Sequence, residues 1–225
     1  MVGCPLNTVV YKLDKGTALG GKMSETKDNR FTSGVNAIMV VVFILNLIYS
    51  HEDNIIMIAL TGGGRLVDIL SATNASVFSG FQVHRLITYG YLQPAIWHLL
   101  ANVYALWYVG LYLEKALGLT RLFVIYHVGL IVPCAVFLFI FPNGVMYGAS
   151  PAIFCCLGLM AMWLIKDRNL ISKYRSLRGF RYLLCYMIIS NFLGIGTFVV
   201  HFLGFLVGLM LGIFVNGSRY QHSEE

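Results

Sequence analysis

The sequence predicts an all-α, polytopic membrane protein with about six transmembrane helices. Of its 225 residues, 58% are apolar and only 12% are charged, whereas charged residues make up about 25% of an average soluble domain. The mean hydropathy is +0.74. The charged residues are also clustered, which leaves four uncharged blocks, at residues 31–50, 86–113, 122–165 and 182–218. This composition excludes a soluble globular domain, a disulfide scaffold and a disordered chain.

The lengths of the uncharged blocks give the number of helices. A helix that crosses the hydrocarbon core needs about 20 apolar residues, so the first two blocks hold one span each. A single helix over residues 182–218 would measure roughly 55 Å, far longer than the ~30 Å core. Turn-forming clusters at 141–144 and 191–196 divide each of the last two blocks into two spans. We expect the fifth span to begin within residues 178–181.

The Lys and Arg residues predict the orientation. With six spans, all 16 of them except Arg65 and Arg85 fall on one side, and the positive-inside rule makes that side the cytoplasm. We therefore expect a cytoplasmic tail at residues 1–30, a membrane core at 31–216 and a second cytoplasmic tail at 217–225, in the plasma membrane. The net charge of +6 then reflects topology and attraction to anionic lipid, and predicts no nucleic-acid partner.

The external segment between the first two spans, residues 51–94, is too short for a separate domain and long for a simple connector. Segments of this length often carry function. The five cysteines include no CxxC pair, which predicts neither a disulfide framework nor a metal site. We expect no metal and no cofactor.

Polar residues at membrane depth are functional candidates, because burying them in hydrocarbon is costly. No Asp or Glu lies within any predicted span. This excludes a paired-aspartate intramembrane protease and a carboxylate proton relay, and His51-Glu52 lacks the second histidine of a zinc-protease motif. The candidates are His98, Asn102, His127, Ser150, Ser190, Asn191 and His201. We interpret His127, Ser190 and Asn191 as structural.

Counting from the cytoplasmic charges places three candidates at one depth. At 1.5 Å per residue, Ser150, His98 and His201 lie roughly 24 to 27 Å above the inner boundary, on three different helices. His127 lies roughly 9 Å above that boundary, too far from the other three to meet them. The polar residues near the outer surface therefore form one candidate site.

A serine and a histidine at the same depth predict a hydroxyl nucleophile with an imidazole base. Because no carboxylate lies near, Ser150 and His201 would form a dyad. His98 and Asn102 are four residues apart and share a helical face, where both could donate hydrogen bonds to an oxyanion. The alternatives stay open: Ser150-Pro151 also fits a helix N-cap, and the histidines and Asn102 also fit interhelical hydrogen bonding.

Small residues spaced four apart predict how the fourth and sixth spans pack. Such spacing gives each helix a smooth face for close backbone approach, which would bring Ser150 and His201 within reach of each other. A plain packing seam is the alternative. The expected faces are Gly204, Gly208 and Gly212 against Gly148, Ala152 and Cys156.

Short motifs occur in order along the chain. They are Arg85-Leu86-Ile87-Thr88 followed by His98-Leu99-Leu100-Ala101-Asn102 (HxxxN), Glu114-Lys115-Ala116-Leu117-Gly118 (ExxxG), Gly148-Ala149-Ser150 (the start of GxSG), and His201-Phe202-Leu203-Gly204 with Gly208 (HxxGxxxG). Together they resemble the rhomboid family of intramembrane serine proteases. The similarity runs from about Arg85 to Gly212.

The resemblance implies a six-helix rhomboid-like bundle with Ser150 as nucleophile and His201 as general base. It also implies an oxyanion site made by the backbone N–H of Ser150 and the side chains of His98 and Asn102. The implied supporting residues are Gly148, Phe154 and Gly204.

Three positions depart from the family pattern. The second glycine of GxSG is Pro151, which lacks its own N–H but leaves that of Ser150 and biases Ser150 away from helical geometry. Phe154 stands where the family often has Tyr, which keeps a ring for stacking on His201 without the hydroxyl. His84 replaces the Trp that usually precedes the loop arginine.

We therefore expect an endopeptidase that cleaves single-span membrane proteins near the outer surface of the bilayer, after the substrate helix unwinds and exposes its scissile carbonyl. The alternative is a catalytically inactive rhomboid-like protein that binds or escorts membrane clients. Pro151 favours that alternative and the intact Ser150/His201 pair opposes it. A small transporter is disfavoured, because the spans contain no charge and the two halves show no repeat.

Overall fold

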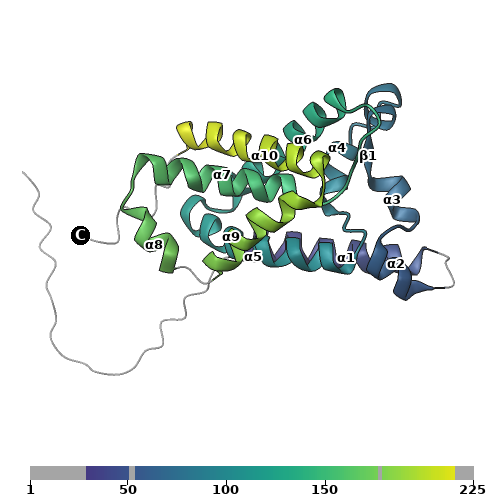
Figure 1. Ribbon diagram of the computed structural model, residues 1–225, viewed down its shortest axis with the longest axis horizontal. Helices are drawn as coiled ribbons and strands as arrows, with labels where there is room; N and C mark the ends of the chain where they lie inside the picture. Colours follow the sequence, from purple (N-terminus) through teal and green to yellow (C-terminus); the bar gives the residue numbers. More distant parts are fainter. Residues whose placement is uncertain (1–28, 51–53, 177–178, 216–225) are drawn as a thin grey trace, which may run out of the picture.

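The computed structural model describes residues 29–50, 54–176 and 179–215, and six main helices form a bundle within them (Figure 1). Four of the six are long and apolar enough to cross a membrane, and the other two are shorter apolar helices. This confirms the predicted all-α, six-helix membrane fold. The main helices are α1 (Arg30–Ile48), α5 (Ile96–Leu117), α6 (Leu119–Ile140), α7 (Ser150–Lys166), α9 (Phe180–Ile189) and α10 (Ile195–Phe214).

The helix boundaries agree with the predicted breaks. α6 ends at Ile140, and α9 begins at Phe180, inside the expected interval. A 3-10 turn, η3 (Ser190–Leu193), extends α9, and Gly194 with φ +144° separates it from α10. The expected tails at 1–30 and 217–225 lie outside the described residues, apart from residues 29 and 30.

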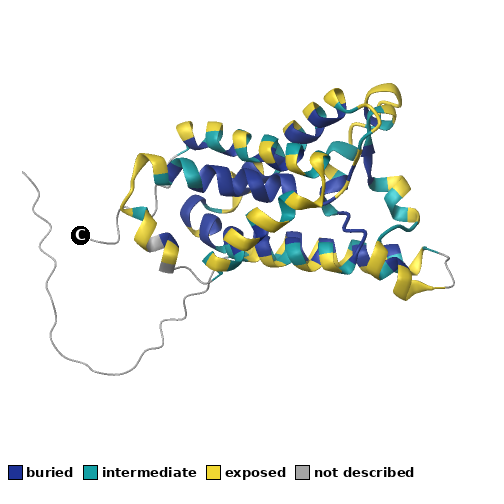
Figure 2. Cartoon of the chain, viewed as in Figure 1, coloured by how far each residue is buried: buried dark blue, intermediate teal, exposed yellow. Residues whose placement is uncertain are grey.

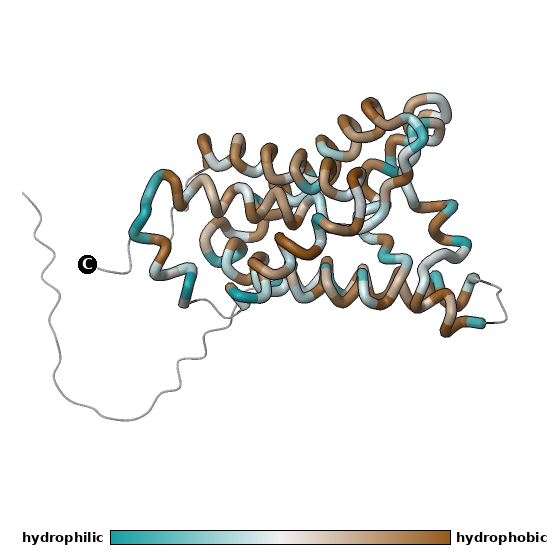
Figure 3. Tube along the Cα trace, in the orientation of Figure 1, coloured by the Kyte–Doolittle hydropathy of each residue, from teal (hydrophilic) through white to brown (hydrophobic). Residues whose placement is uncertain are grey.

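The external segment folds into short elements at one end of the bundle. Hydrophilic and hydrophobic residues alternate at that end, hydrophilic residues lie around α8 (Leu170–Ser176), and the main helices are largely hydrophobic (Figure 3). Ala72 pairs with Met146 in a two-stranded antiparallel ladder between β1 and β2. The short elements of the segment are α2 (Ile55–Thr61), α3 (Arg65–Leu70), β1 (Ala72–Thr73), η1 (Ala75–Ser79), α4 (Arg85–Thr88) and η2 (Tyr89–Tyr91), and the partner strand β2 (Val145–Met146) lies between α6 and α7.

The end of this segment enters the bundle. Tyr89 is fully buried, and its hydroxyl donates to the Leu130 carbonyl of α6 at 2.8 Å. Its own carbonyl accepts from the Gly148 N–H at 2.9 Å. The Arg85 guanidinium donates to the carbonyls of Asp68 and Ser71 at 2.7 and 2.8 Å. Because the buried polar groups of Tyr89 find partners on α6 and at Gly148, this part of the segment can lie inside the bundle and support the residues before α7.

α7 is the central helix. It is buried along most of its length and packs against α10, α6 and α5 (Figure 2). Its side chains in the interior are mostly small or apolar, which suits a helix surrounded by other helices. The position of α7 matters for the site because its first residue is Ser150.

The seam between α7 and α10 has the predicted α10 face but a different α7 face. A Cβ at Gly204 would meet the Pro151 carbonyl, and one at Gly208 would meet the Cys155 carbonyl. A Cβ at Gly212 would lie 2.6 Å from the Met162 Cβ and 3.2 Å from the Leu159 carbonyl oxygen, and one at Gly158 of α7 would meet the Phe205 carbonyl of α10. The α7 face therefore includes Pro151, Cys155, Gly158 and Leu159, and the predicted face of Gly148, Ala152 and Cys156 is wrong.

The reason for this difference is a competing contact on the neighbouring side of α7. Ala152 and the Cys155 side chain face α6, where a Cβ added at Gly129 would lie 2.6 Å from the Cys155 Cβ and 3.0 Å from the Ala152 Cα, so Cys155 turns only its carbonyl toward α10. Gly148 faces the ring of His98 on α5. Both α6 and α10 pack against small residues of α7. The spacing of these residues along the sequence does not show which helix contacts which face.

Glu114 corrects the expectation that no carboxylate lies within a span. α5 runs to Leu117, and the buried Glu114 side chain accepts from the Phe31 N–H, the Thr32 N–H and the Thr32 hydroxyl at 2.8, 2.9 and 2.7 Å. These donors belong to the first turn of α1, where backbone N–H groups have no partner in their own helix and favour a negative charge. Glu114 therefore joins α1 to α5.

Gly208→Ala should destabilise the protein. The added Cβ would meet the Cys155 backbone, which cannot rotate away, and overpacking of this kind costs about 1–3 kcal/mol. The measurement is thermal unfolding in detergent. Gly34→Ala on α1 is the matched control, since nothing lies within 4 Å of its added Cβ. Equal unfolding temperatures for the two variants would contradict the close α7–α10 contact.

Candidate active site

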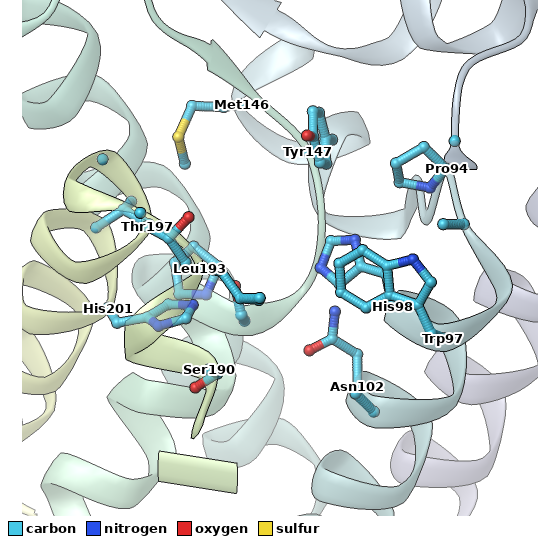
Figure 4. A pocket seen from close by; sticks show the side chains of 18 of the residues that line it. Pro94, Trp97, His98, Asn102, Met146, Tyr147, Ser190, Leu193, Thr197 and His201 are labelled. Atoms are coloured by element: carbon cyan, nitrogen blue, oxygen red, sulfur yellow. The ribbon is translucent and has the colours of Figure 1, made fainter. Parts of the chain in front are cut away.

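The candidate catalytic residues line one cavity of about 870 Å³ between α5, α7, α9 and α10. Ser150, His201, His98 and Asn102 all contribute to its wall. His201 lies on one side of this space, with His98 and Asn102 across from it (Figure 4). The structure thus brings together the three residues that the sequence places at one depth on three helices, and with them Asn102, which shares a helical face with His98.

Ser150 is the first residue of α7 and is 8% exposed. The residue in the N-cap position is Ala149, and no side-chain cap hydrogen bond is made there. The interpretation of Ser150 as an N-cap is therefore wrong, and its hydroxyl is not used to hold the helix end. Pro151 occupies the first turn, where the missing N–H costs no helical hydrogen bond.

His201 is held by contacts on two sides. Its ring stacks on Phe154 with centroids 4.1 Å apart and planes 9° from parallel. Its Nδ1 lies 3.0 Å from Oδ1 of Asn191. Gly204, one turn further along α10, lies against the Pro151 carbonyl. The hydrogen bonds of the described residues do not include one between Ser150 and His201, and such bonds often tighten only when substrate binds.

The opposite wall is formed by α5 and the residue before Ala149. A Cβ at Gly148 (φ +101°) would lie 2.7 Å from Nε2 of His98 and 3.5 Å from Nδ2 of Asn102. Only glycine lets the backbone come this close. Ser150, His98 and Asn102 therefore present polar groups to the same part of the cavity, where they could act on an oxyanion.

A hydrogen-bonded chain fixes the orientation of Asn102. Its Nδ2 donates to Oε1 of Gln93 at 2.8 Å, and its Oδ1 accepts from the Tyr186 hydroxyl at 2.7 Å. Gln93 is fully buried and donates to the Gly90 carbonyl at 3.3 Å. This chain uses one Nδ2 hydrogen of Asn102 and leaves the other for the cavity.

Gln93 and Tyr186 are the residues of the site that the sequence analysis does not identify, although both lie in uncharged blocks. Asn191 is a sequence candidate with a structural interpretation, and the structure adds its contact with His201. The sequence could have indicated Gln93, because its amide side chain lies within an otherwise apolar block. The pairing of these residues with Asn102 and His201 depends on contacts between helices.

His127 lies apart from the site, as predicted. Its Nε2 is 3.0 Å from the Tyr91 hydroxyl and its Nδ1 is 2.8 Å from the Phe123 carbonyl. Burial raises the pKa of the Tyr91 phenol above its ordinary value, so this hydroxyl stays neutral near pH 7. These contacts join α6 to η2 and give His127 a structural role.

The comparisons with known proteins show the family of the chain. The rhomboid domain family model matches residues 80–218, which is more than half of the chain. The chain belongs to the rhomboid family. It is an integral, multi-pass membrane protein.

Two curated relatives are rhomboid-like proteins. The chain is 33% identical over 140 residues to RHOMBOID-like protein 7 of Arabidopsis thaliana, covering 58% of this chain and 42% of that protein. It is 28% identical over 129 residues to Rhomboid-like protease 3 of Toxoplasma gondii, covering 56% of this chain and 46% of that protein. The chain spans less than half the length of these relatives.

The two departures from the rhomboid pattern nearest the serine are accommodated locally. Pro151 places its carbonyl against Gly204, and Phe154 keeps the stacked ring on His201. The ring centroids of Phe154 and Tyr186 also lie 5.7 Å apart.

Within the part of the chain that the structure describes, no group of three His, Cys, Asp or Glu side chains could hold a metal ion.

Gly148→Ala should lose stability in two ways. The backbone at φ +101° is strained for alanine, and the added Cβ would collide with the His98 ring. Gly63→Ala is the matched control, because Gly63 has φ +115° but nothing lies within 4 Å of an added Cβ. We expect Gly148→Ala to be less stable than Gly63→Ala by about 1–3 kcal/mol in thermal unfolding. Equal losses would mean that the His98 ring moves aside freely.

Proposed function

We propose that this rhomboid protein is an intramembrane serine endopeptidase that uses Ser150 and His201. The observation that carries the proposal is the shared cavity, with the stacked His201 on one wall and His98 and Asn102 on the other. The relative named Rhomboid-like protease 3 supports the same activity. The substrates we propose are single-span membrane proteins.

The proposed reaction proceeds through an acyl-enzyme. The Ser150 hydroxyl attacks the scissile carbonyl carbon while Nε2 of His201 takes its proton. The oxyanion accepts hydrogen bonds from the Ser150 N–H, His98 and Asn102. When the C–N bond breaks, His201 returns the proton to the leaving amine. Water then attacks the ester, again with His201 as base, and releases the acid and free Ser150.

The substrate reaches the cavity from the side in this proposal. Tyr182 and Tyr186 of α9 and Trp97 and Ala101 of α5 line the cavity, so an extended segment could enter between these helices. A helical segment satisfies its own backbone amides and must unwind before the carbonyl is accessible. We propose that both termini lie in the cytoplasm and the cavity near the outer surface of the plasma membrane; the positive-inside rule supports this orientation, because it puts the side rich in Lys and Arg in the cytoplasm.

A catalytically inactive rhomboid-like protein that binds or escorts membrane clients is the second candidate. Two observations favour it: Pro151 follows the serine, and the described hydrogen bonds include none between Ser150 and His201. The intact pair in one cavity opposes it, since an apo enzyme need not show the catalytic hydrogen bond.

Purified protein in proteoliposomes should cleave a model single-span substrate. Ser150→Ala and His201→Ala should each reduce the rate on the order of 10³-fold or more, because each removes a group that bonds change at directly. Ser172→Ala and His84→Ala are matched controls at exposed positions outside the cavity and should retain the wild-type rate. Equal cleavage by wild type and Ser150→Ala would refute the proposal.

A fluorophosphonate should label the wild type and not Ser150→Ala, because only an activated serine attacks the phosphorus atom. The labelling is followed by in-gel fluorescence on protein whose unfolding temperature shows that it is folded. A folded wild type that neither labels nor cleaves would support the inactive client-binding protein instead.

A further inference from the structure

We propose that Asn191 is a positioning residue that holds the proton of His201 on Nδ1 and so turns the Nε2 lone pair toward the cavity. Asn191 lies on η3, the short turn between α9 and α10. The inference rests on the proposed function for its catalytic meaning. The hydrogen bond between Asn191 and His201 can be tested separately, without any measurement of substrate cleavage.

The orientation of the Asn191 amide is fixed by a second partner. Nδ2 of Asn191 donates to the Met187 carbonyl at 2.6 Å. A carbonyl only accepts hydrogen bonds, so the group facing it must be the NH₂ of the amide. Oδ1 of Asn191 is therefore the atom that lies 3.0 Å from Nδ1 of His201.

The tautomer of His201 follows from this orientation. Oδ1 has no proton to give, so the hydrogen bond forms only when Nδ1 of His201 is the donor. A neutral imidazole carries one proton. With that proton on Nδ1, Nε2 has the free lone pair that a general base needs.

Phe154 and Asn191 constrain His201 in different ways. Stacking on Phe154 fixes the plane of the ring, but a ring rotated by 180° about its Cβ–Cγ bond would stack in the same plane with Nδ1 exchanged for Cδ2 and Nε2 for Cε1. The Asn191 hydrogen bond distinguishes these two states. His201 is only 2% exposed, so few water molecules can replace a lost partner at Nδ1.

Asn191 supplies an acceptor without a buried charge. A carboxylate would perform the same orientation but would be costly within the apolar part of a membrane protein. The amide is also anchored to α9 through Met187, and the neighbouring Ser190 hydroxyl donates to the Tyr186 carbonyl at 2.5 Å. The base on α10 is thus oriented by a turn that is tied to the end of α9.

Kinetics of two Asn191 variants test the catalytic consequence. Asn191→Leu has a similar volume and no acceptor, and we expect kcat to fall on the order of 100-fold with KM nearly unchanged, since misplacing a catalytic group by about 1 Å costs that much. Asn191→Asp keeps an acceptor for Nδ1 in either protonation state and should retain most of the wild-type kcat. Equal losses in both variants, or none in Asn191→Leu, would overturn the proposal.

Asn36→Leu is the matched control. Nδ2 of Asn36 on α1 donates to the Val103 carbonyl at 3.3 Å, so its substitution also removes an amide from the bundle interior but leaves His201 untouched. We expect it to change kcat less than twofold. A loss as large as that of Asn191→Leu would mean that any lost interior amide impairs the enzyme, and the specific role of Asn191 would be refuted.

The second measurement is the tautomer itself. In protein labelled with ¹⁵N-histidine, the His201 signals are assigned by their loss in His201→Gln. We expect the proton on Nδ1 in the wild type and in Asn191→Asp, and a shift toward Nε2 in Asn191→Leu. A wild-type proton on Nε2, or an unchanged tautomer in Asn191→Leu, would overturn the inference. If the wild type does not cleave substrate, the protease proposal fails. The tautomer measurement still tests whether Asn191 holds the His201 proton on Nδ1.

Discussion

The close backbone contact between α7 and α10 is the constraint on which the site depends. In a membrane, apolar side chains gain little by leaving lipid for protein, so helices associate through tight packing. Gly204 and Gly208 let α10 approach the carbonyls of Pro151 and Cys155. Ser150 begins α7 and His201 lies one turn before Gly204, so the same contact that holds the two helices together brings both side chains to one cavity.

The scarcity of charge determines the chemistry of the interior. Asn102 is oriented by Gln93 and Tyr186, and His201 faces Asn191. Neutral amides and hydroxyls can be buried at a lower desolvation cost than ions, provided that each finds a partner. The buried carboxylate of Glu114 meets the first turn of α1, where unpaired N–H groups and the helix dipole offset its desolvation.

The external segment is a structural part of the site as well as a cover for it. The Tyr89 carbonyl accepts a hydrogen bond from the Gly148 N–H, and the Gln93 side chain accepts one from the Asn102 amide. Both residues precede α5 and lie inside the bundle. The backbone of Gly148 and the side chain of Asn102, which form one wall of the cavity, therefore depend on a segment that composition alone identifies only as a long connection.

The sequence by itself determined the membrane class, the six helices, the breaks within the last two uncharged blocks and the four residues that share the cavity. These features follow from runs of uncharged residues, turn-forming clusters and distances along a helix, all of which are local. The tertiary structure decided which face of α7 meets α10. Adjacent faces of a helix differ by about 100° of rotation, and small residues occur on both, Gly158 toward α10 and Ala152 toward α6. It also decided that Gln93 and Asn191 contact Asn102 and His201, because those contacts depend on how separate elements are rotated and joined.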